Sequence, residues 1–96
     1  MILLIVNAVK ISPDVALKIF EKHGVLMDEI HDLLGRDYPI FRKVAGDQYL
    51  AIGLSRSRYL TIFFRYDMLS KEVEIATAYP SSKDQAKFYK KQCKRR

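Results

Sequence analysis

The sequence predicts a single α+β domain over residues 1–96, with two N-terminal helices and a basic C-terminal helix packed on a small antiparallel sheet of three to four strands. Three observations predict this class. Apolar residues recur at helical spacing over residues 13–34, runs rich in β-branched and aromatic residues occupy 49–78, and helical spacing returns after Pro80. The predicted order is a possible first strand, two helices, three strands and a final helix.

Residues 1–6, Met-Ile-Leu-Leu-Ile-Val, predict a buried strand. The run is too short for a transmembrane helix, and no basic segment precedes it as in a signal peptide. The chain has one cysteine, Cys93, which excludes an internal disulfide and fits a reducing compartment. We therefore expect a cytoplasmic protein that does not associate with membranes.

The first helix is predicted from its start, its face and its end. Ser12-Pro13-Asp14 supplies an N-cap, a proline at the first helical position and an acid in the first turn. Gly24 is typical of a left-handed stop. One apolar face is expected from the i, i+3, i+4, i+7 spacing of Ala16, Ile19, Phe20 and His23.

A second helix is expected at about residues 27–34, ended by Gly35, and its inward positions would be Ile30, Leu33 and Leu34. Residues 36–47 contain proline, glycine and several charges, which predicts a polar connection. Within that connection, Ile40 and Phe41 are expected to contact the core.

Three strands follow in the prediction. Residues 49–54 and 59–66 flank a short hairpin loop at 55–58, and the aromatic and β-branched content of 59–66 favours a central strand. Residues 72–78 alternate, which predicts Val73, Ile75 and Thr77 on one face.

The last helix carries the whole net charge. Residues 83–96 hold seven Lys or Arg and one acid, whereas residues 1–82 hold ten basic and ten acidic side chains. Ser81 or Ser82 would cap this helix, with Ala86, Tyr89 and Cys93 facing the core. A stripe of lysines is predicted on another face, at Lys83, Lys87, Lys90 and Lys94.

Such a cationic block is expected of a protein that meets a polyanion or an acidic partner. Phe88 and Tyr89 lie among the lysines, and aromatic rings beside ammonium groups suit RNA, because bases stack on the rings while phosphates meet the cations. The alternative is a solvated helix end, where basic residues are favoured by the helix dipole.

Several segments together resemble the BrnT family, which are small ribonuclease toxins of type II toxin–antitoxin modules with a RelE-like fold. Lys-His-Gly-Val at residues 22–25 resembles the end of the family's first helix. Residues 49–55 resemble its first hairpin strand, and residues 58–60 resemble the start of the next. Residues 74–83, followed by Tyr89, resemble its last strand and closing helix.

The resemblance covers roughly residues 9–91 in the correct order. The sequence departs from the family's pattern at two places. Residues 9–12 replace a Phe-Glu-Trp-Asp-like start, and Tyr79 stands where the family typically has arginine.

RNA cleavage without a metal needs a base for the 2′-hydroxyl, cations for the phosphorane and an acid for the leaving oxygen. The sequence lacks a His-x-x-x-His pair and a second cysteine, so we expect neither a metal site nor a cofactor. The catalytic candidates are Arg58, Arg65, Tyr79, Lys83 and His23. The candidates for RNA binding are Arg56, Lys87, Tyr89, Lys90 and Lys94.

Each candidate also has a structural interpretation: a single arginine can be a solvated side chain, His23 can pack at its helix end, and Tyr89 can belong to the core. The resemblance implies an RNA substrate and a cognate antitoxin, and an apolar edge strand could pair two chains into a homodimer. One alternative is a module that binds RNA or protein without catalysis, and another is an adaptor whose tail contacts DNA or an acidic protein. Convergence of Arg58, Arg65, Tyr79 and Lys83 would favour catalysis.

Overall fold

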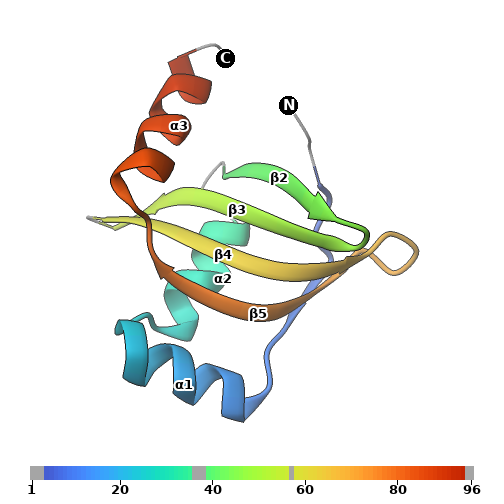
Figure 1. Ribbon diagram of the computed structural model, residues 1–96. Helices are drawn as coiled ribbons and strands as arrows, with labels where there is room; N and C mark the ends of the chain where they lie inside the picture. The colour runs from blue at the N-terminus through green and yellow to red at the C-terminus, as the bar shows by residue number, and fades with distance from the viewer. Residues whose placement is uncertain (1–3, 36–38, 57, 95–96) are drawn as a thin grey trace.

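The computed structural model describes residues 4–35, 39–56 and 58–94, which form one mixed five-stranded sheet with three helices (Figure 1). The strands are β1 (Ala8–Lys10), β2 (Ile40–Ala45), β3 (Gln48–Ser55), β4 (Arg58–Asp67) and β5 (Glu72–Pro80), in the order β1-β5-β4-β3-β2. β1 pairs with β5 in parallel, and the other neighbours are antiparallel. The strand predicted to be central, β4, lies at the middle of the sheet.

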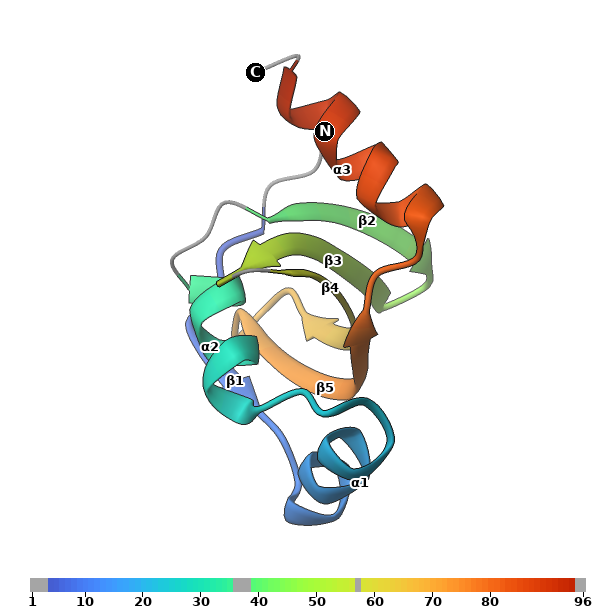
Figure 2. The same ribbon diagram turned by 90° about the vertical axis from the view of Figure 1, so that its left-hand side faces the viewer.

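The helices are α1 (Pro13–His23), α2 (Met27–Gly35) and α3 (Lys83–Lys94). α2 covers one face of the sheet, α1 lies beside β5, and α3 starts just after the end of β5 and rises in the direction away from α1 (Figures 1 and 2). No helix in the described part of the chain is long and apolar enough to cross a membrane.

The helix boundaries follow the predicted signals. The Ser12 hydroxyl accepts a hydrogen bond from the Val15 N–H at 3.2 Å, and Gly24 ends α1 with φ of +64°. Ser82, rather than Ser81, caps α3, because its Oγ accepts from the Gln85 N–H at 3.2 Å. These local bonds satisfy backbone groups that a helix end would otherwise leave unpaired.

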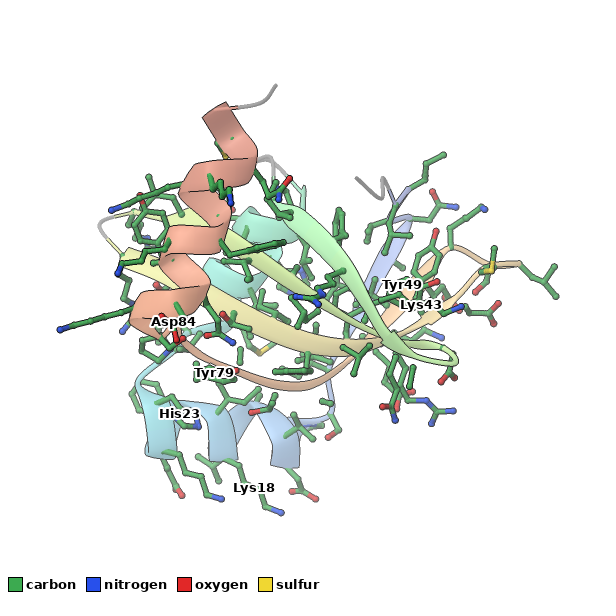
Figure 3. The ribbon with its side chains drawn as sticks, turned by 45° about the horizontal axis from the view of Figure 1, so that its top comes forward. Lys18, His23, Lys43, Tyr49, Tyr79 and Asp84 are labelled. Carbon is green, nitrogen blue, oxygen red and sulfur yellow. The ribbon has the colours of Figure 1, made fainter. Side chains whose placement is uncertain are left out.

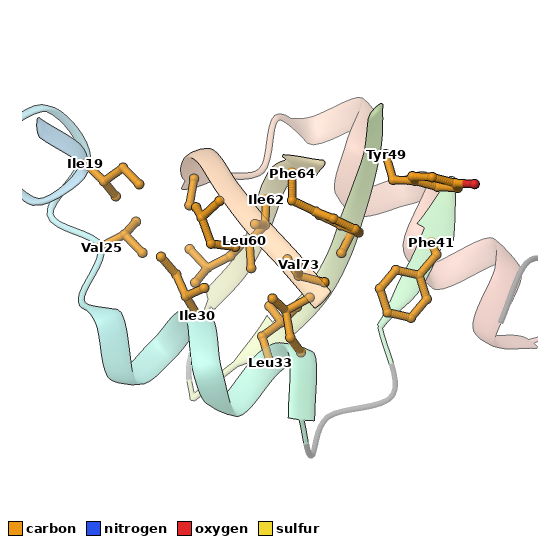
Figure 4. Packing of buried hydrophobic residues seen from close by; sticks show 14 of the residues in the cluster. Ile19, Val25, Ile30, Leu33, Phe41, Tyr49, Leu60, Ile62, Phe64 and Val73 are labelled. Carbon is orange, nitrogen blue, oxygen red and sulfur yellow. The ribbon is translucent and has the colours of Figure 1, made fainter. Parts of the chain in front are cut away.

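The hydrophobic core lies between α2 and one face of the sheet (Figure 4). Ile30 and Leu33 of α2 pack here with Leu60 and Ile62 of β4, and all four are fully buried. Gly53 of β3 lies so close to α2 that a Cβ atom there would stand 3.0 Å from Leu33 Cγ. On α1, Ile19 faces this core, but Phe20 was wrongly predicted to do so and is 52% exposed.

The prediction of a polar connection over residues 36–47 is wrong in its second half, because residues 40–45 form the edge strand β2. Ile40 and Phe41 are buried as expected, since they pair with Ile52 and Ala51 of β3. The rest of β2 is exposed, so it lacks the apolar alternation that would have identified a strand.

The predicted first strand is also misplaced. Residues 1–3 lie outside the described residues, residues 4–6 are not a strand, and β1 begins at Ala8. Tyr66 Oη donates a hydrogen bond to the Ile5 carbonyl at 2.6 Å. This contact attaches residues 4–6 to the sheet, although they are not a strand. The sheet is therefore mixed and five-stranded, not antiparallel with three to four strands.

Two further predictions about facing side chains need correction. The register of β5 shifts between its pairings with Phe63 and Phe64, so Ala78 is buried in place of Thr77 after Val73 and Ile75. In α3, Ala86, Tyr89 and Cys93 are half-buried and do not join the core. Tyr89 instead packs on Tyr59, with ring centroids 5.5 Å apart.

Candidate functional site

The face of the sheet opposite α2, here called the open face, carries the polar and aromatic side chains that alternate with the core residues. On β4, Thr61, Phe63 and Arg65 belong to this face because Leu60, Ile62 and Phe64 point into the core. Tyr79 of β5 pairs with Thr61 and therefore shares the open face. α3 stands over one end of this face, as the contacts of Gln85 with Thr61 show.

A hollow of about 230 Å³, here called the α1–β5 hollow, lies where α1 meets β5. Its lining is Val15, Lys18, Ile19, Lys22, His23, Ala76 and Thr77. The register shift pairs Ile75 with Phe64 and Thr77 with Phe63, so Ala76 between them does not pair with β4 and forms a β-bulge. Bulges are over-represented next to functional sites, because they interrupt the ladder and redirect side chains.

Two aromatic residues that can move a proton lie here: His23 lines the hollow, and Tyr79 contacts His23. His23 ends α1 and is half-buried, and its ring centroid lies 5.9 Å from that of Tyr79 at an interplanar angle of 51°. Phe63 stacks on Tyr79 with centroids 6.1 Å apart. In Figure 3, Tyr79 lies between His23 of α1 and Asp84 at the start of α3. His23 packs at its helix end, as its structural interpretation predicted.

The Tyr79 hydroxyl belongs to a hydrogen-bond network that connects the sheet to α3. Gln85 Nε2 donates to Tyr79 Oη at 2.9 Å, and Gln85 Oε1 accepts from the Ser82 N–H at 2.9 Å. Thr61 Oγ1 also donates to Gln85 Oε1 at 3.0 Å and bonds Ser81 Oγ at 2.8 Å. The first turn of α3 is thereby fixed against the strand ends beside Tyr79.

Cations surround this region. Lys18 and Lys22 line the hollow, and Lys83 and Lys87 occupy the first turns of α3, with all four side chains exposed. Within residues 4–35, 39–56 and 58–94, the ion pairs involve none of these lysines. Their charges are therefore free to meet an anionic ligand.

Arg58 has a different environment from the other candidates. It lies on the core side of the sheet, where its guanidinium donates to Glu29 at 2.9 and 3.3 Å and to the Gly24 carbonyl at 2.9 Å. Ser55 Oγ completes the contacts with Glu29 at 3.4 Å. Burial of the Glu29 carboxyl would raise its pKa, but hydrogen bonds from Arg58 and from the Leu26 N–H lower that pKa below its ordinary value.

Arg65 lies on the open face but away from Tyr79. It pairs with Asp47 at 3.2 Å, and both side chains are more than half exposed. It lies four positions along β4 from Thr61, the partner of Tyr79, which is roughly 13 Å along a strand. The structure thus does not bring together the four residues whose convergence would favour catalysis: Arg58, Arg65, Tyr79 and Lys83.

The remaining candidates lie along α3 and at the β3–β4 turn. Lys90 Nζ stands 5.4 Å from the centre of the Tyr59 ring, against which Tyr89 also packs. Arg56 is exposed at the turn, with φ of +55°. The side chain of Lys94 lies outside what the structure describes.

A second hollow, of about 220 Å³, separates α3 from β2 and β3 on the open face. Arg42 stands over the Phe88 ring at 5.6 Å in this hollow, and Leu50 supplies an apolar wall. A planar guanidinium on an aromatic ring is a surface on which a nucleobase can stack.

Sequence reasoning missed Lys18, Lys22, Gln85 and Glu29. The Ser82-to-Gln85 spacing is that of a capping box, so it could have placed Gln85 at the start of α3. Nothing in the sequence indicated that α1 would lie beside a bulge in β5, which is what turns two ordinary helix lysines into part of a hollow.

The chain is thus a small α+β protein with a basic hollow between α1 and β5, which a histidine lines and a tyrosine adjoins through its contact with that histidine. Among solved structures, its fold matches the ribonuclease toxin BrnT from Brucella abortus, with a TM-score of 0.64. The match covers 79% of this chain and 97% of BrnT at 14% sequence identity, so it shows a shared fold. The BrnT-like fold expected from the sequence is confirmed. No protein-family model matches the sequence, and no curated protein matches it.

Proposed function

We propose that this chain is the toxin of a type II toxin–antitoxin module, and that it binds RNA on its open face and cleaves it without a metal ion. The observation that carries this proposal is the pairing of His23 and Tyr79 beside the basic α1–β5 hollow. The fold shared with the ribonuclease toxin BrnT supports it.

In this proposal the 2′-oxygen of the RNA attacks the adjacent phosphorus, and the bond from phosphorus to the 5′-oxygen breaks. His23 takes the proton of the 2′-hydroxyl, and Tyr79 gives a proton to the departing 5′-oxygen. Lys18 and Lys22 face the negative charge that builds on the phosphorane, with Lys83 at the nearby start of α3. The products are a 2′,3′-cyclic phosphate and a 5′-hydroxyl.

The other predicted residues take different places in this proposal. Arg58 holds the β3–β4 hairpin against α2 and is left out of the catalytic set, because it lies on the core side of the sheet, where its Nε and Nη2 are bonded to Glu29 and Gly24. Arg56 and Arg65 remain candidates for phosphate contacts away from the hollow. Lys87, Tyr89, Lys90 and Lys94 would extend the RNA surface along α3, with Arg42 and Phe88 as a stacking surface.

The proposed partner is a cognate antitoxin that acts with this chain in the cytoplasm. An acidic or amphipathic segment of such a partner suits the exposed lysines of α3, because opposite charges steer and orient association. Covering the open face would block the RNA path and silence the toxin.

The second candidate is a module of the same fold that binds RNA or protein without catalysis. Two observations favour it: Arg58 and Arg65 lie apart from Tyr79, and Tyr79 stands where the resembled family typically has arginine. Such a module would use the same lysines and aromatic residues but would leave the RNA intact.

Inducible expression in bacterial cells, followed by growth measurement and total-RNA analysis, distinguishes the two. Wild type is expected to arrest growth and fragment RNA, and Tyr79→Phe is expected to abolish both while keeping the ring contacts with His23 and Phe63. Tyr49→Phe is the matched control, since it removes a hydroxyl from the opposite face of the sheet. Intact RNA at equal soluble expression of wild type would favour the binding module.

A further inference from the structure

The side-chain amide of Gln85 can adopt one orientation only. Its Oε1 position faces the backbone N–H of Ser82 at 2.9 Å, and a backbone N–H is a donor that only an acceptor can satisfy. The atom facing Ser82 must therefore be the amide oxygen. The amide nitrogen then faces Tyr79 Oη at 2.9 Å.

This orientation fixes the direction of the hydrogen bond to Tyr79. An amide nitrogen donates and cannot accept, so the Tyr79 oxygen is the acceptor. The hydroxyl proton of Tyr79 must then point away from Gln85. Across residues 4–35, 39–56 and 58–94, the hydrogen bonds of the structure include no acceptor for that proton.

The surroundings of Tyr79 hold its ring in place. Phe63 stacks on the ring with centroids 6.1 Å apart, and the His23 ring, which lines the α1–β5 hollow, lies tilted against it at 5.9 Å. Lys18 and Lys22 make that hollow basic. A ligand oxygen that carries negative charge and accepts a hydrogen bond fits this arrangement best.

We infer that Gln85 is a positioning residue that holds Tyr79 as a hydrogen-bond donor towards an RNA phosphodiester. The inference rests on the proposed function and specifies the role of Tyr79 within it: the tyrosine gives a proton and the base lies elsewhere. Thr61 strengthens the arrangement, because its hydroxyl donates to the same amide oxygen of Gln85 and opposes a flip.

The Gln85→Glu substitution tests this with little change of shape. A carboxylate keeps the capping box, since it still accepts from the Ser82 N–H. It also accepts from the Tyr79 hydroxyl, which turns the tyrosine proton inward. RNA cleavage at pH 7 is expected to fall by about 100-fold or more, the usual contribution of a general acid. Combining it with Tyr79→Phe should cause no further loss.

The pH dependence separates this role from a structural one. Below about pH 4.3, the ordinary pKa of a glutamic acid, the introduced carboxyl gains a proton and can donate to Tyr79 again. Cleavage by Gln85→Glu, relative to wild type at the same pH, should therefore recover as the pH falls. Gln92→Glu adds the same charge to the same helix and should behave like wild type throughout.

A readout that needs no RNA comes from NMR of the protein labelled with ¹³C at tyrosine Cζ. The Tyr79 signal, assigned by its loss in Tyr79→Phe, should shift in Gln85→Glu at pH 7 and return towards wild type on acidification. An unchanged signal, or a shifted signal with undiminished cleavage, overturns the inference. A shifted signal in a protein whose wild type leaves RNA intact overturns the proposed function instead.

Discussion

Replacing Arg58 by alanine should destabilise the fold strongly while leaving the open face unchanged. Arg58 donates to both carboxylate oxygens of Glu29 and to the carbonyl that ends α1. The substitution leaves Glu29 with the Leu26 N–H and the Ser55 hydroxyl as its partners, in a site where its side chain is 6% exposed. A buried carboxylate without its counter-charge is costly.

The expected loss of unfolding free energy lies between the values for a buried and for an exposed ion pair. Breaking a buried ion pair costs about 3–5 kcal/mol, whereas an exposed pair contributes about 0–1 kcal/mol. Glu29 is buried but Arg58 is 37% exposed, so water screens part of the interaction. We therefore expect the free energy of unfolding to fall by about 2 kcal/mol, a midpoint shift of about 2 M urea for a domain with a slope near 1 kcal/mol/M.

Urea unfolding followed by circular dichroism measures this. Arg65→Ala is the control, because its ion pair with Asp47 is exposed and should be worth less than about 0.5 kcal/mol. The difference in unfolding free energy between wild type and Arg58→Ala should also depend on pH. The folded-state pKa of Glu29 is lowered, so its stabilisation is present above the unfolded pKa of about 4.3 and is lost as pH falls through the folded value. A loss below about 0.5 kcal/mol at pH 7, or a difference that does not narrow as the pH falls below about 4.3, would refute the reasoning.

Three further predictions concern packing, backbone and RNA. Gly53→Ala should lower the free energy of unfolding by about 1 kcal/mol, because the added Cβ would lie 3.0 Å from the fully buried Leu33. Thermal unfolding measures this, and an unchanged melting temperature would contradict it. Gly24→Ala should cost about 1 kcal/mol at φ of +64°, measured in the same way and contradicted by equal stability. Lys18→Ala combined with Lys22→Ala should weaken binding of single-stranded RNA, measured by fluorescence anisotropy. The slope of log affinity against log salt concentration should fall by about 1.4, because two phosphate contacts are lost. An unchanged slope would show that these lysines do not contact phosphates.

Local signals in the sequence identified the elements that local physics defines. Ser12, Pro13 and Gly24 set the ends of α1, because caps and φ preferences act within a few residues. The aromatic and β-branched run of β4 likewise predicted the central strand. β2 escaped notice because, as an edge strand, it buries only its first two residues.

The candidate site was harder to predict because its parts come from distant segments. Arg58 was predicted to be catalytic, but its partner Glu29 lies 29 residues earlier and its burial cannot be inferred from α2 alone. The bulge at Ala76 is hidden in a sequence that alternates regularly, and it changes which side chains of β5 reach each face. His23 and Tyr79 were both identified as candidates, but only the fold brings their rings together.

The most direct test of the central claim is cleavage of a short RNA by the purified protein in the presence of EDTA. We expect fragments that end in a 2′,3′-cyclic phosphate, and no cleavage when the 2′-hydroxyl at the cut site is replaced by hydrogen. Activity should be lost in Tyr79→Phe and kept in Tyr49→Phe. An RNA that stays intact under these conditions, or is cut equally well by Tyr79→Phe, would contradict this claim.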